Sequence, residues 1–287
     1  MATMKDFRTE NKPTWCPGCG DFAVLAALQK AVASLGLEPE EVVCVSGIGC
    51  SGKIAQHFGG YGFHSLHGRS LPTATGVKLG NQDLTVIAAG GDGDGYGIGM
   101  GHLVHAVRRN IDLTYIVMDN QIYGLTTGQT SPTSKKGFRS KTSPEGAAEE
   151  PVKAVETALV NGASFVAQAF SGDVKQMTVL FEEAVRHRGF SLINCFSPCV
   201  TFNKVNTYDW FRENVIRLKD REEYDSGDRD AALSVMRKTH GLVTGILCRE
   251  ERPAYHEVMT GAHSVAASKM DLNIPREDMR EIFHSFR

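Results

Sequence analysis

Short apolar runs that end in glycine or in polar residues are the feature of this sequence that most constrains its fold. Amphipathic helical segments separate several of them, and the runs lie at 42–46, 83–90, 112–120, 164–170 and 190–197. Strands that alternate with helices predict a parallel sheet, because parallel neighbours must be joined by a crossover, which is usually a helix. We therefore expect an α/β fold with a doubly wound, mostly parallel sheet.

The size and charge of the chain restrict its class. Its 287 residues are enough for one large α/β domain or two small ones. A formal net charge of −2 gives no reason to expect nucleic acid or an anionic membrane as a partner. No apolar run reaches the length of a transmembrane helix, and the first residues lack the apolar core of a signal peptide. These features predict a cytoplasmic chain without a membrane or nucleic-acid partner.

The strand pattern fades after about residue 203, so we expect a domain over 1–205 and a C-terminal extension over 206–287. Residues 207–220 have a helical pattern. Near the end of the chain, apolar residues recur at helical spacing, namely Met279, Ile282, Phe283 and Phe286. Such a stripe needs burial, either against the same domain or against a partner chain.

Residues 126–152 form a long polar segment rich in turn formers, which is typical of a surface loop. The segment directly follows the polar end of a strand, and α/β folds bind ligands at such ends. A plain surface loop and a lid over a ligand site are both compatible with this pattern.

Two glycine-rich stretches invite nucleotide-binding interpretations. Residues 47–54, GIGCSGKI, nearly fit the P-loop pattern, but Ile54 stands where a magnesium-binding hydroxyl is needed. Residues 90–101 satisfy G-x-G-x-x-G in no register, which disfavours a Rossmann dinucleotide site. A P-loop nucleotide hydrolase is therefore a weak alternative function.

Asp92 and Asn120 suggest a different anion site. Asp92 follows the strand at 83–90, and Asn120 lies 28 residues later at the end of the next strand. Neighbouring parallel strands would bring both side chains to the same sheet edge. Mg²⁺ prefers oxygen ligands and usually completes its shell with phosphate oxygens. The pair predicts a magnesium–diphosphate site, and the alternative is an ordinary capped turn with a structural asparagine.

The chain has seven cysteines, and an odd number in a reducing compartment favours metal binding or buried thiols over disulfides. Cys16 and Cys19 form a C-x-x-C pair. Such a pair alone can be half of a zinc site, a redox dithiol or part of an iron–sulfur ligand set. A zinc-stabilised interaction module is the corresponding non-enzymatic alternative.

Several motifs together carry a specific resemblance. GDG followed after 24 to 30 residues by an asparagine near a strand end is the thiamine diphosphate motif, and it occurs within residues 90–133. WCPGCG, GIGCSGK, HGRSLPTATGVKLGN and SPCVTFN occur around it in family order. Over roughly residues 12–210 the chain resembles the β subunit of 2-oxoacid:ferredoxin oxidoreductases, whose members include 2-oxoglutarate enzymes. The resemblance implies a sheet of the diphosphate-binding type.

The resemblance also implies roles for individual residues. Mg²⁺ would be held by Asp92, Asn120 and the backbone carbonyl of Ile122. Thiamine diphosphate would contact two glycine-rich turns and the loop beside them, through Gly93, Asp94, Gly124, Leu125, Ile48, Gly49, Cys50 and Ser51. His67 would lie close to the cofactor as a catalytic candidate. Lys53 would meet a substrate carboxylate, although a lysine after a glycine turn is usually just solvated.

By the same resemblance, a 4Fe–4S cluster would be held by Cys16, Cys19, Cys50 and Cys199. Four thiolates also fit zinc, but zinc carries no electrons. Cys50 and Cys199 each follow a predicted strand, which places both at the cofactor edge of the sheet. The N-terminal segment would then fold back over that edge. The remaining cysteines, Cys44, Cys195 and Cys248, are interpreted as buried thiols.

The implied activity is oxidative decarboxylation of a 2-oxoacid with coenzyme A, giving acyl-CoA and CO₂, with electrons passing through the cluster to ferredoxin. We expect 2-oxoglutarate as the substrate, with pyruvate or a broad 2-oxoacid range as the alternative. Many relatives have a lysine where this chain has Thr127, which weakens that substrate inference.

The resemblance also implies a partner subunit. Thiamine enzymes need a glutamate on a second domain, and the family places that domain on an α subunit. The chain alone should therefore be inactive and pair with an α subunit as a heterodimer or heterotetramer.

Overall fold

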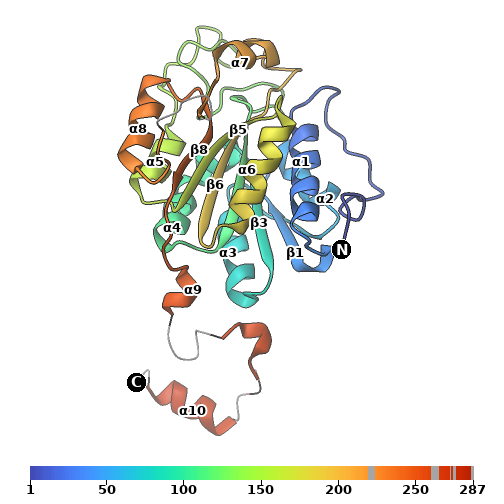
Figure 1. The fold of residues 1–287 in the computed structure, drawn as a ribbon, viewed down its shortest axis with the longest axis vertical. Coiled ribbons are helices and arrows are strands. Elements are labelled where there is room, and N and C mark those ends of the chain that lie inside the picture. Colours follow the sequence, from blue (N-terminus) through green and yellow to red (C-terminus); the bar gives the residue numbers. More distant parts are fainter. Residues whose placement is uncertain (219–223, 260–264, 272, 274–275, 286–287) are drawn as a thin grey trace.

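The computed structural model describes residues 1–218, 224–259, 265–271, 273 and 276–285. Within these residues an eight-stranded sheet forms, in the order β2-β1-β3-β4-β6-β5-β8-β7 (Figure 1). Neighbouring strands are parallel except for β5 and β8. The strands are β1 Val42–Ser46, β2 Tyr61–His64, β3 Thr85–Gly91, β4 Leu113–Asp119, β5 Phe165–Phe170, β6 Phe190–Phe196, β7 Ile216–Arg217 and β8 Val243–Arg249. The expected α/β class with a mostly parallel sheet is confirmed.

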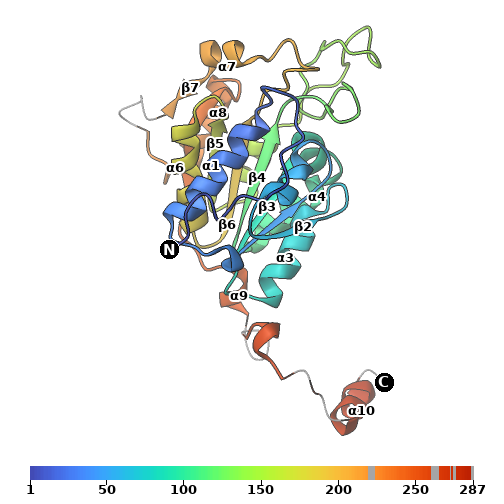
Figure 2. The same ribbon diagram turned by 90° about the vertical axis from the view of Figure 1, so that its right-hand side faces the viewer.

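Helices cover both faces of this sheet (Figure 2). One face packs on α1 Asp21–Ser34, α2 Ile54–His57 and α6 Val174–Arg186. The other packs on α3 Ser70–Gly80, α4 Met100–Arg109, α5 Ala154–Val160 and α8 Arg229–Lys238. The remaining α-helices are α7 Tyr208–Asn214, α9 Tyr255–Val258 and α10 Arg276–Ser285. The 3₁₀ helices are η1 Pro39–Glu41, η2 Ser51–Lys53 and η6 Ala267–Lys269, and η3 Gly93–Ile98 is a π-helix.

The central strands are buried on both faces, which is why they appear in the sequence as continuous apolar runs. In β4, Tyr115 and Val117 join the core with α4, whereas Ile116 and Met118 join the core with α1 and α6. This alternation follows from the period of two along a strand. The same pattern made these strands predictable.

Three strands differ from the sequence expectations. All four residues of β2 are exposed, so this edge strand lacks a buried apolar pattern. The helix expected over 207–220 ends at Asn214, and β7 follows at Ile216. The expectation that the sheet ends near residue 203 is wrong, because β8 pairs antiparallel with β5. Its run is short and interrupted by Gly245, which adopts φ +129°.

The C-terminal stripe falls on α10, which is helical as the spacing indicates. Phe283 is 66% exposed, and Figures 1 and 2 show α10 apart from the sheet. Burial of the apolar stripe of α10 against the same domain is therefore not observed. Phe286 and the side chain of Ile282 lie outside the described residues. The division of the chain near residue 205 stays a prediction.

Among the described helices, none combines the length and the apolar character needed to cross a membrane.

Candidate functional site

The site is built where β1, β3, β4 and β6 end side by side. Register pairs Ser46 with Ala89, Gly91 with Met118, and Asp119 with Phe196. The segments that follow these strands therefore meet at one edge of the sheet. Those segments carry most of the residues predicted for the site.

Asp92 and Asn120 meet at this edge, as their strand positions predict. Asp92 is only 2% exposed, and its Oδ1 accepts a hydrogen bond from the Asn120 backbone N–H at 3.4 Å. The Asn120 side-chain Oδ1 accepts from the N–H of Ile122 at 3.1 Å. Burial raises the pKa of Asp92, because a carboxylate loses hydration in the protein interior.

A second buried carboxyl group, Asp119, lies close to Asp92 and was not predicted from the sequence. The Thr133 hydroxyl lies 2.7 Å from Asp92 Oδ2 and 2.8 Å from Asp119 Oδ1. One hydroxyl has one proton and can satisfy only one of these acceptors at a time. Burial, and then the nearby Asp92 carboxylate, raise the pKa of Asp119. Two carboxyl groups this close in a buried setting suit a bound cation.

The long segment after Asn120 packs onto this edge. Ser134 Oγ donates to the carbonyl of Gln121 at 2.7 Å, and Thr133 is itself buried. Part of the predicted 126–152 loop thus closes over the strand ends. The position of Asp119 beside Asn120 was a usable signal for it, whereas no local pattern distinguishes Thr133 from the other polar residues of the loop.

Glycine is required at position 93 by close packing. A Cβ there would lie 2.1 Å from the Tyr123 ring, and the Tyr123 hydroxyl donates to the Gly93 carbonyl at 3.2 Å. The turn η3 can therefore approach the segment after β4 only with glycine at this position. The contact of Gly93 with a diphosphate stays a prediction.

Asp94 connects two loops at the site. Its Oδ1 accepts from the N–H of Ile48 at 2.9 Å and from the N–H of Gly68 at 2.7 Å, and it lies 3.2 Å from His67 Nδ1. Burial raises the pKa of Asp94, while these two N–H donors oppose the shift. Asp94 thus holds the loop of Ile48 beside that of His67.

The other predicted contacts differ in accessibility. Ile48 and Leu125 are exposed at the surface, whereas Ser51 is buried. Gly49 adopts φ +121°, a conformation that favours glycine.

The Lys53 ammonium donates to the Thr14 carbonyl at 3.4 Å, so it is tied to the N-terminal segment. Ile54, which stands where a P-loop needs a magnesium-binding hydroxyl, packs into the core.

Gly124 lies where the predicted cluster ligands and the predicted magnesium ligands come together. A Cβ built on Gly124 would lie 3.4 Å from Cys199 Sγ, 3.8 Å from Cys50 Sγ and 4.0 Å from Asn120 Nδ2. Two predicted cluster ligands and one predicted magnesium ligand therefore border the same small volume. The sequence separates Cys50 from Cys199 by 149 residues, and the sheet brings them together.

Known proteins match the chain over this region and beyond it. The thiamine pyrophosphate enzyme C-terminal TPP-binding domain matches residues 47–195, and the family of C-terminal regions of the pyruvate ferredoxin oxidoreductase β subunit matches residues 199–264. A Sulfolobus sp 2-oxoacid:ferredoxin oxidoreductase subunit beta is 46% identical, over 74% of this chain and 70% of its own. The chain belongs to the 2-oxoacid:ferredoxin oxidoreductase β-subunit family.

Two further relatives extend this similarity over nearly the whole chain. The 2-oxoglutarate synthase subunit KorB of Methanothermobacter marburgensis is 35% identical and covers 94% of each chain. The 2-oxoglutarate:ferredoxin oxidoreductase of Magnetococcus marinus, solved with 2-oxoglutarate, coenzyme A and succinyl-CoA bound, has a TM-score of 0.89 and 38% identity. That likeness covers 98% of this chain and 96% of the solved one.

In this member of the oxidoreductase family, the N-terminal segment reaches the site as expected. The Trp15 indole N–H donates to the Cys50 carbonyl at 2.7 Å, and the N–H of Gly20 donates to the Pro198 carbonyl at 3.3 Å. Ser197 Oγ donates to the buried Asp21 carboxyl at 2.6 Å. These contacts fasten the C-x-x-C segment to the loops that carry Cys50 and Cys199. Neither Trp15 nor Asp21 was predicted from the sequence to have this role.

The pKa values of the Cys19 and Cys50 thiols depend in part on the other predicted cluster ligands. Burial, and then the Asp21 carboxylate, raise the pKa of the Cys50 thiol to about 11, and Cys199 and Cys16 contribute in the same direction. The pKa of Cys19 is raised by burial, with smaller effects from Cys50 and Cys199. The four residues thus form one neighbourhood, with Cys16 at its exposed side.

No group of three or more His, Cys, Asp and Glu side chains within the described residues is arranged to hold a metal ion. Raised thiol pKa values keep Cys19 and Cys50 protonated, and thiolate ligands form only when metal binding displaces these protons. The four-cysteine ligand set therefore remains a prediction. Cys44, Cys195 and Cys248 are buried, as expected for thiols without a ligand role.

Proposed function

We propose that the chain holds thiamine diphosphate, Mg²⁺ and a 4Fe–4S cluster, and works with an α subunit as a 2-oxoacid:ferredoxin oxidoreductase. The reaction would convert a 2-oxoacid and coenzyme A to acyl-CoA and CO₂ and transfer electrons to ferredoxin. The observation that carries this proposal is the position of Gly124, where Asn120 and the thiols of Cys50 and Cys199 border one volume. A redox centre held there would adjoin the cofactor.

The thiamine cofactor supplies the electron sink for decarboxylation, and the cluster accepts electrons one at a time. The residues of this chain bind and orient these groups. Asp92 and Asn120 offer oxygen ligands to Mg²⁺, and the glycine at position 93 allows the backbone to approach a diphosphate. Asp94 keeps the loop of Ile48 fixed beside this position.

The four cysteines supply the donor set that a 4Fe–4S cluster requires. Trp15 and Asp21 hold the loops of these cysteines together through their contacts with Cys50 and Ser197. Burial of Cys199 restricts the access of water to this position.

Exposed apolar side chains support the requirement for an α subunit. Ile48, Leu66, Ile98 and Leu125 are all exposed and lie in the segments that follow strands at the site edge. Large apolar side chains gathered around a site are typical of a surface that another protein covers. An α subunit seated there would close the cofactor edge and contribute the second domain.

The relatives support 2-oxoglutarate as substrate, since several carry that name and the solved relative binds it. Lys53 lies beside the site but is bonded to Thr14, so it would have to release this carbonyl to reach a substrate carboxylate. Thr127 is exposed and adopts φ +76° in the loop after Gly124. Its hydroxyl cannot replace the charge of the lysine found in many relatives.

The chain should be purified without oxygen together with its α subunit, and iron, sulfide, zinc and thiamine should be measured. We expect iron and sulfide in equal amounts, bound thiamine diphosphate, and coenzyme A-dependent ferredoxin reduction that is faster with 2-oxoglutarate than with pyruvate. A colourless complex with zinc and no iron would contradict the proposal. Faster turnover of pyruvate would contradict only the substrate assignment.

A further inference from the structure

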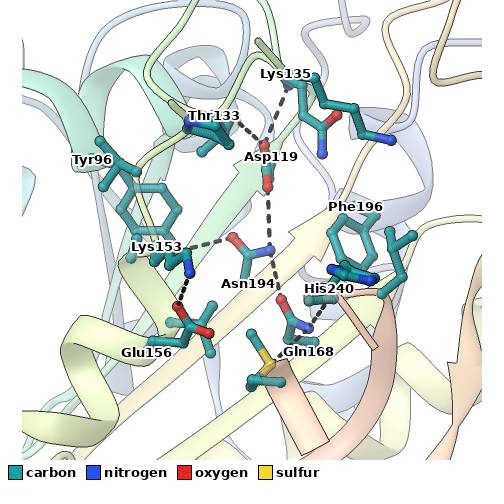
Figure 3. Close-up of a pocket in the computed structure, with 18 of the residues that line it drawn as sticks. Tyr96, Asp119, Thr133, Lys135, Lys153, Glu156, Gln168, Asn194, Phe196 and His240 are labelled. Atoms are coloured by element: carbon teal, nitrogen blue, oxygen red, sulfur yellow. Dashed lines mark hydrogen bonds and ion pairs between the residues drawn. The ribbon is translucent and has the colours of Figure 1, made fainter. Parts of the chain in front are cut away.

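A cavity of about 370 Å³ lies behind the sheet edge where Asp92 and Asn120 meet. It is bordered by α5, α8 and the ends of β4, β5 and β6 (Figure 3). We call it the α5–α8 cavity. Its volume is at the lower end of the range of roughly 300–1,000 Å³ that is usual for small-molecule sites. Asp119 and Thr133 form the wall that it shares with Asp92. The cavity is therefore next to the predicted cofactor site but separate from it.

The inner wall of the cavity is a buried hydrogen-bonded chain. Asn194 Nδ2 donates to Asp119 Oδ2 at 3.4 Å and to Gln168 Oε1 at 3.2 Å, and the Tyr96 hydroxyl donates to Asn194 Oδ1 at 2.9 Å. These contacts fix the orientations of the Asn194 and Gln168 amides and hold the side chains of the wall in place (Figure 3). Such a wall is preorganised, which lowers the entropic cost of binding.

One buried acceptor in the cavity lining lacks a partner. Gln121 is 9% exposed, and its Oε1 receives no hydrogen bond within the described part of the chain. Gln121 also adopts φ +57°, an uncommon conformation for a residue other than glycine. An unpaired buried oxygen is costly and is normally satisfied by water or by a ligand donor. The polar lining is therefore incomplete in the chain by itself.

The rim of the cavity carries an excess of cations. Lys135, Lys153 and Arg237 line it, and the acidic lining residues are Glu156 at the rim and Asp119 on the inner wall. Glu156 lies 3.8 Å from Lys153, whereas no carboxylate of the described residues pairs with Lys135 or Arg237. The Lys135 ammonium lies 4.0 Å from the centre of the Trp210 ring, where it is partly desolvated. Cations without a carboxylate partner around a partly enclosed space attract an anion.

Apolar side chains complete the wall between the cationic rim and the polar inner side. Val152, Val155, Phe196 and Leu242 all line the cavity. A ligand that fits therefore combines an anionic group with a short apolar body, and the donor for Gln121 Oε1 is a ligand hydroxyl or an ordered water. We propose that the α5–α8 cavity is a second binding site, which takes a small organic carboxylate or phosphate ester with its anionic group at the Lys135–Arg237 rim.

The test uses the full chain purified with its partner subunit and titrated calorimetrically with valerate, butyl phosphate and the neutral valeramide. We expect saturable binding of at least one of the two anions, with valeramide about tenfold weaker or worse. Comparison of the two anions distinguishes a carboxylate site from a phosphate site. Binding of neither anion, or equal binding of valeramide, would overturn the proposal. No turnover is needed, so this result is independent of ferredoxin reduction.

Neighbouring residues provide matched controls. Arg237→Ala and Lys135→Ala should each weaken anion binding about tenfold, as expected for loss of a charged hydrogen bond. Lys238→Ala and Lys136→Ala alter adjacent lysines that do not line the cavity and should leave the affinity unchanged. Equal weakening by Lys238→Ala or Lys136→Ala would indicate a general surface charge effect and overturn the proposal.

A steric variant tests the location. Val152 is 40% exposed and lines the cavity, so Val152→Trp should fill it without disturbing the core. This variant should lose anion binding while the content of iron and thiamine stays unchanged. Retained binding in Val152→Trp would place the anion elsewhere and overturn the proposal.

Discussion

The hydroxyl of Thr133 donates to the buried carboxyl of Asp92 across 2.7 Å, which ties the long loop after β4 to the end of β3. The same hydroxyl lies 2.8 Å from Asp119 Oδ1, so one residue of the loop contacts two carboxyl groups. We expect Thr133→Val to weaken retention of Mg²⁺ and thiamine diphosphate about tenfold, because an isosteric methyl leaves Asp92 without this donor. Equilibrium dialysis of the purified complex measures the loss.

Thr133→Ser keeps the hydroxyl and should restore most of the thiamine retention. Iron content should be similar in both variants, since Thr133 makes no contact with a cysteine. Equal loss of iron and thiamine in Thr133→Val would show that the substitution unfolds the domain and contradict this prediction.

A side chain at Gly124 should interfere with the groups bound beside it. The methyl group of Gly124→Ala would lie 3.4 Å from Cys199 Sγ and within 4.0 Å of Asn120 Nδ2, inside the space that the bound groups would occupy. We expect reduced iron content in the anaerobically purified complex, measured by colorimetric iron assay. Gly76→Ala is the matched control, because nothing lies within 4 Å of that position in α3. It should keep full iron content and stabilise the fold by roughly 0.5–1 kcal/mol.

The four predicted cluster ligands should differ from the other cysteines in their reaction with iodoacetamide. In the folded metal-free chain Cys16 should be alkylated first, because it is exposed. Cys44 and Cys195 should stay unmodified until the chain unfolds, since they are fully buried and burial raises the pKa of Cys44 to about 12. In the iron-loaded protein Cys16 should become protected, as peptide mass spectrometry would show. Equal labelling of Cys16 with and without iron would remove it from the ligand set.

His187 should contribute a loss of stability as the pH falls from about 7.5 to 5.5, whereas the raised pKa values of Asp119 and Asp21 act in the opposite direction. Burial lowers the pKa of His187, whose Nε2 lies 2.8 Å from Ser164 Oγ. The unfolded state takes up a proton near pH 6.5, whereas the folded state resists it, so the unfolded state binds more protons in this window. His187→Gln should therefore reduce the slope of the unfolding free energy against pH, measured by urea denaturation.

The exposed His105 provides the comparison for this experiment, and His105→Gln should leave the slope unchanged. His57, His102 and His256 also have lowered pKa values, so His187→Gln should remove only part of the histidine contribution to the slope. An unchanged slope in His187→Gln would contradict the prediction.

Much of the fold was predictable because its signals are local. Each central strand buries both faces, so β1, β3, β4, β5 and β6 appear as apolar runs that any window of the sequence reveals. The edge strands β2 and β7 have exposed side chains, and β8 is interrupted by Gly245, so none of the three has such a run. Their pairing depends on neighbours distant in the chain.

The sequence by itself determined the α/β class, the placement of Asp92 and Asn120 at strand ends, and the identity of the motif cysteines. These follow from the period of side chains along a strand and from residue types at its end. Only the tertiary structure decided that Thr133 bridges Asp92 and Asp119, that Gly124 faces Cys50 and Cys199, and that a cavity with an unpaired Gln121 lies behind them. Such contacts join segments up to 149 residues apart, and no local pattern encodes which loops will meet once the sheet has formed.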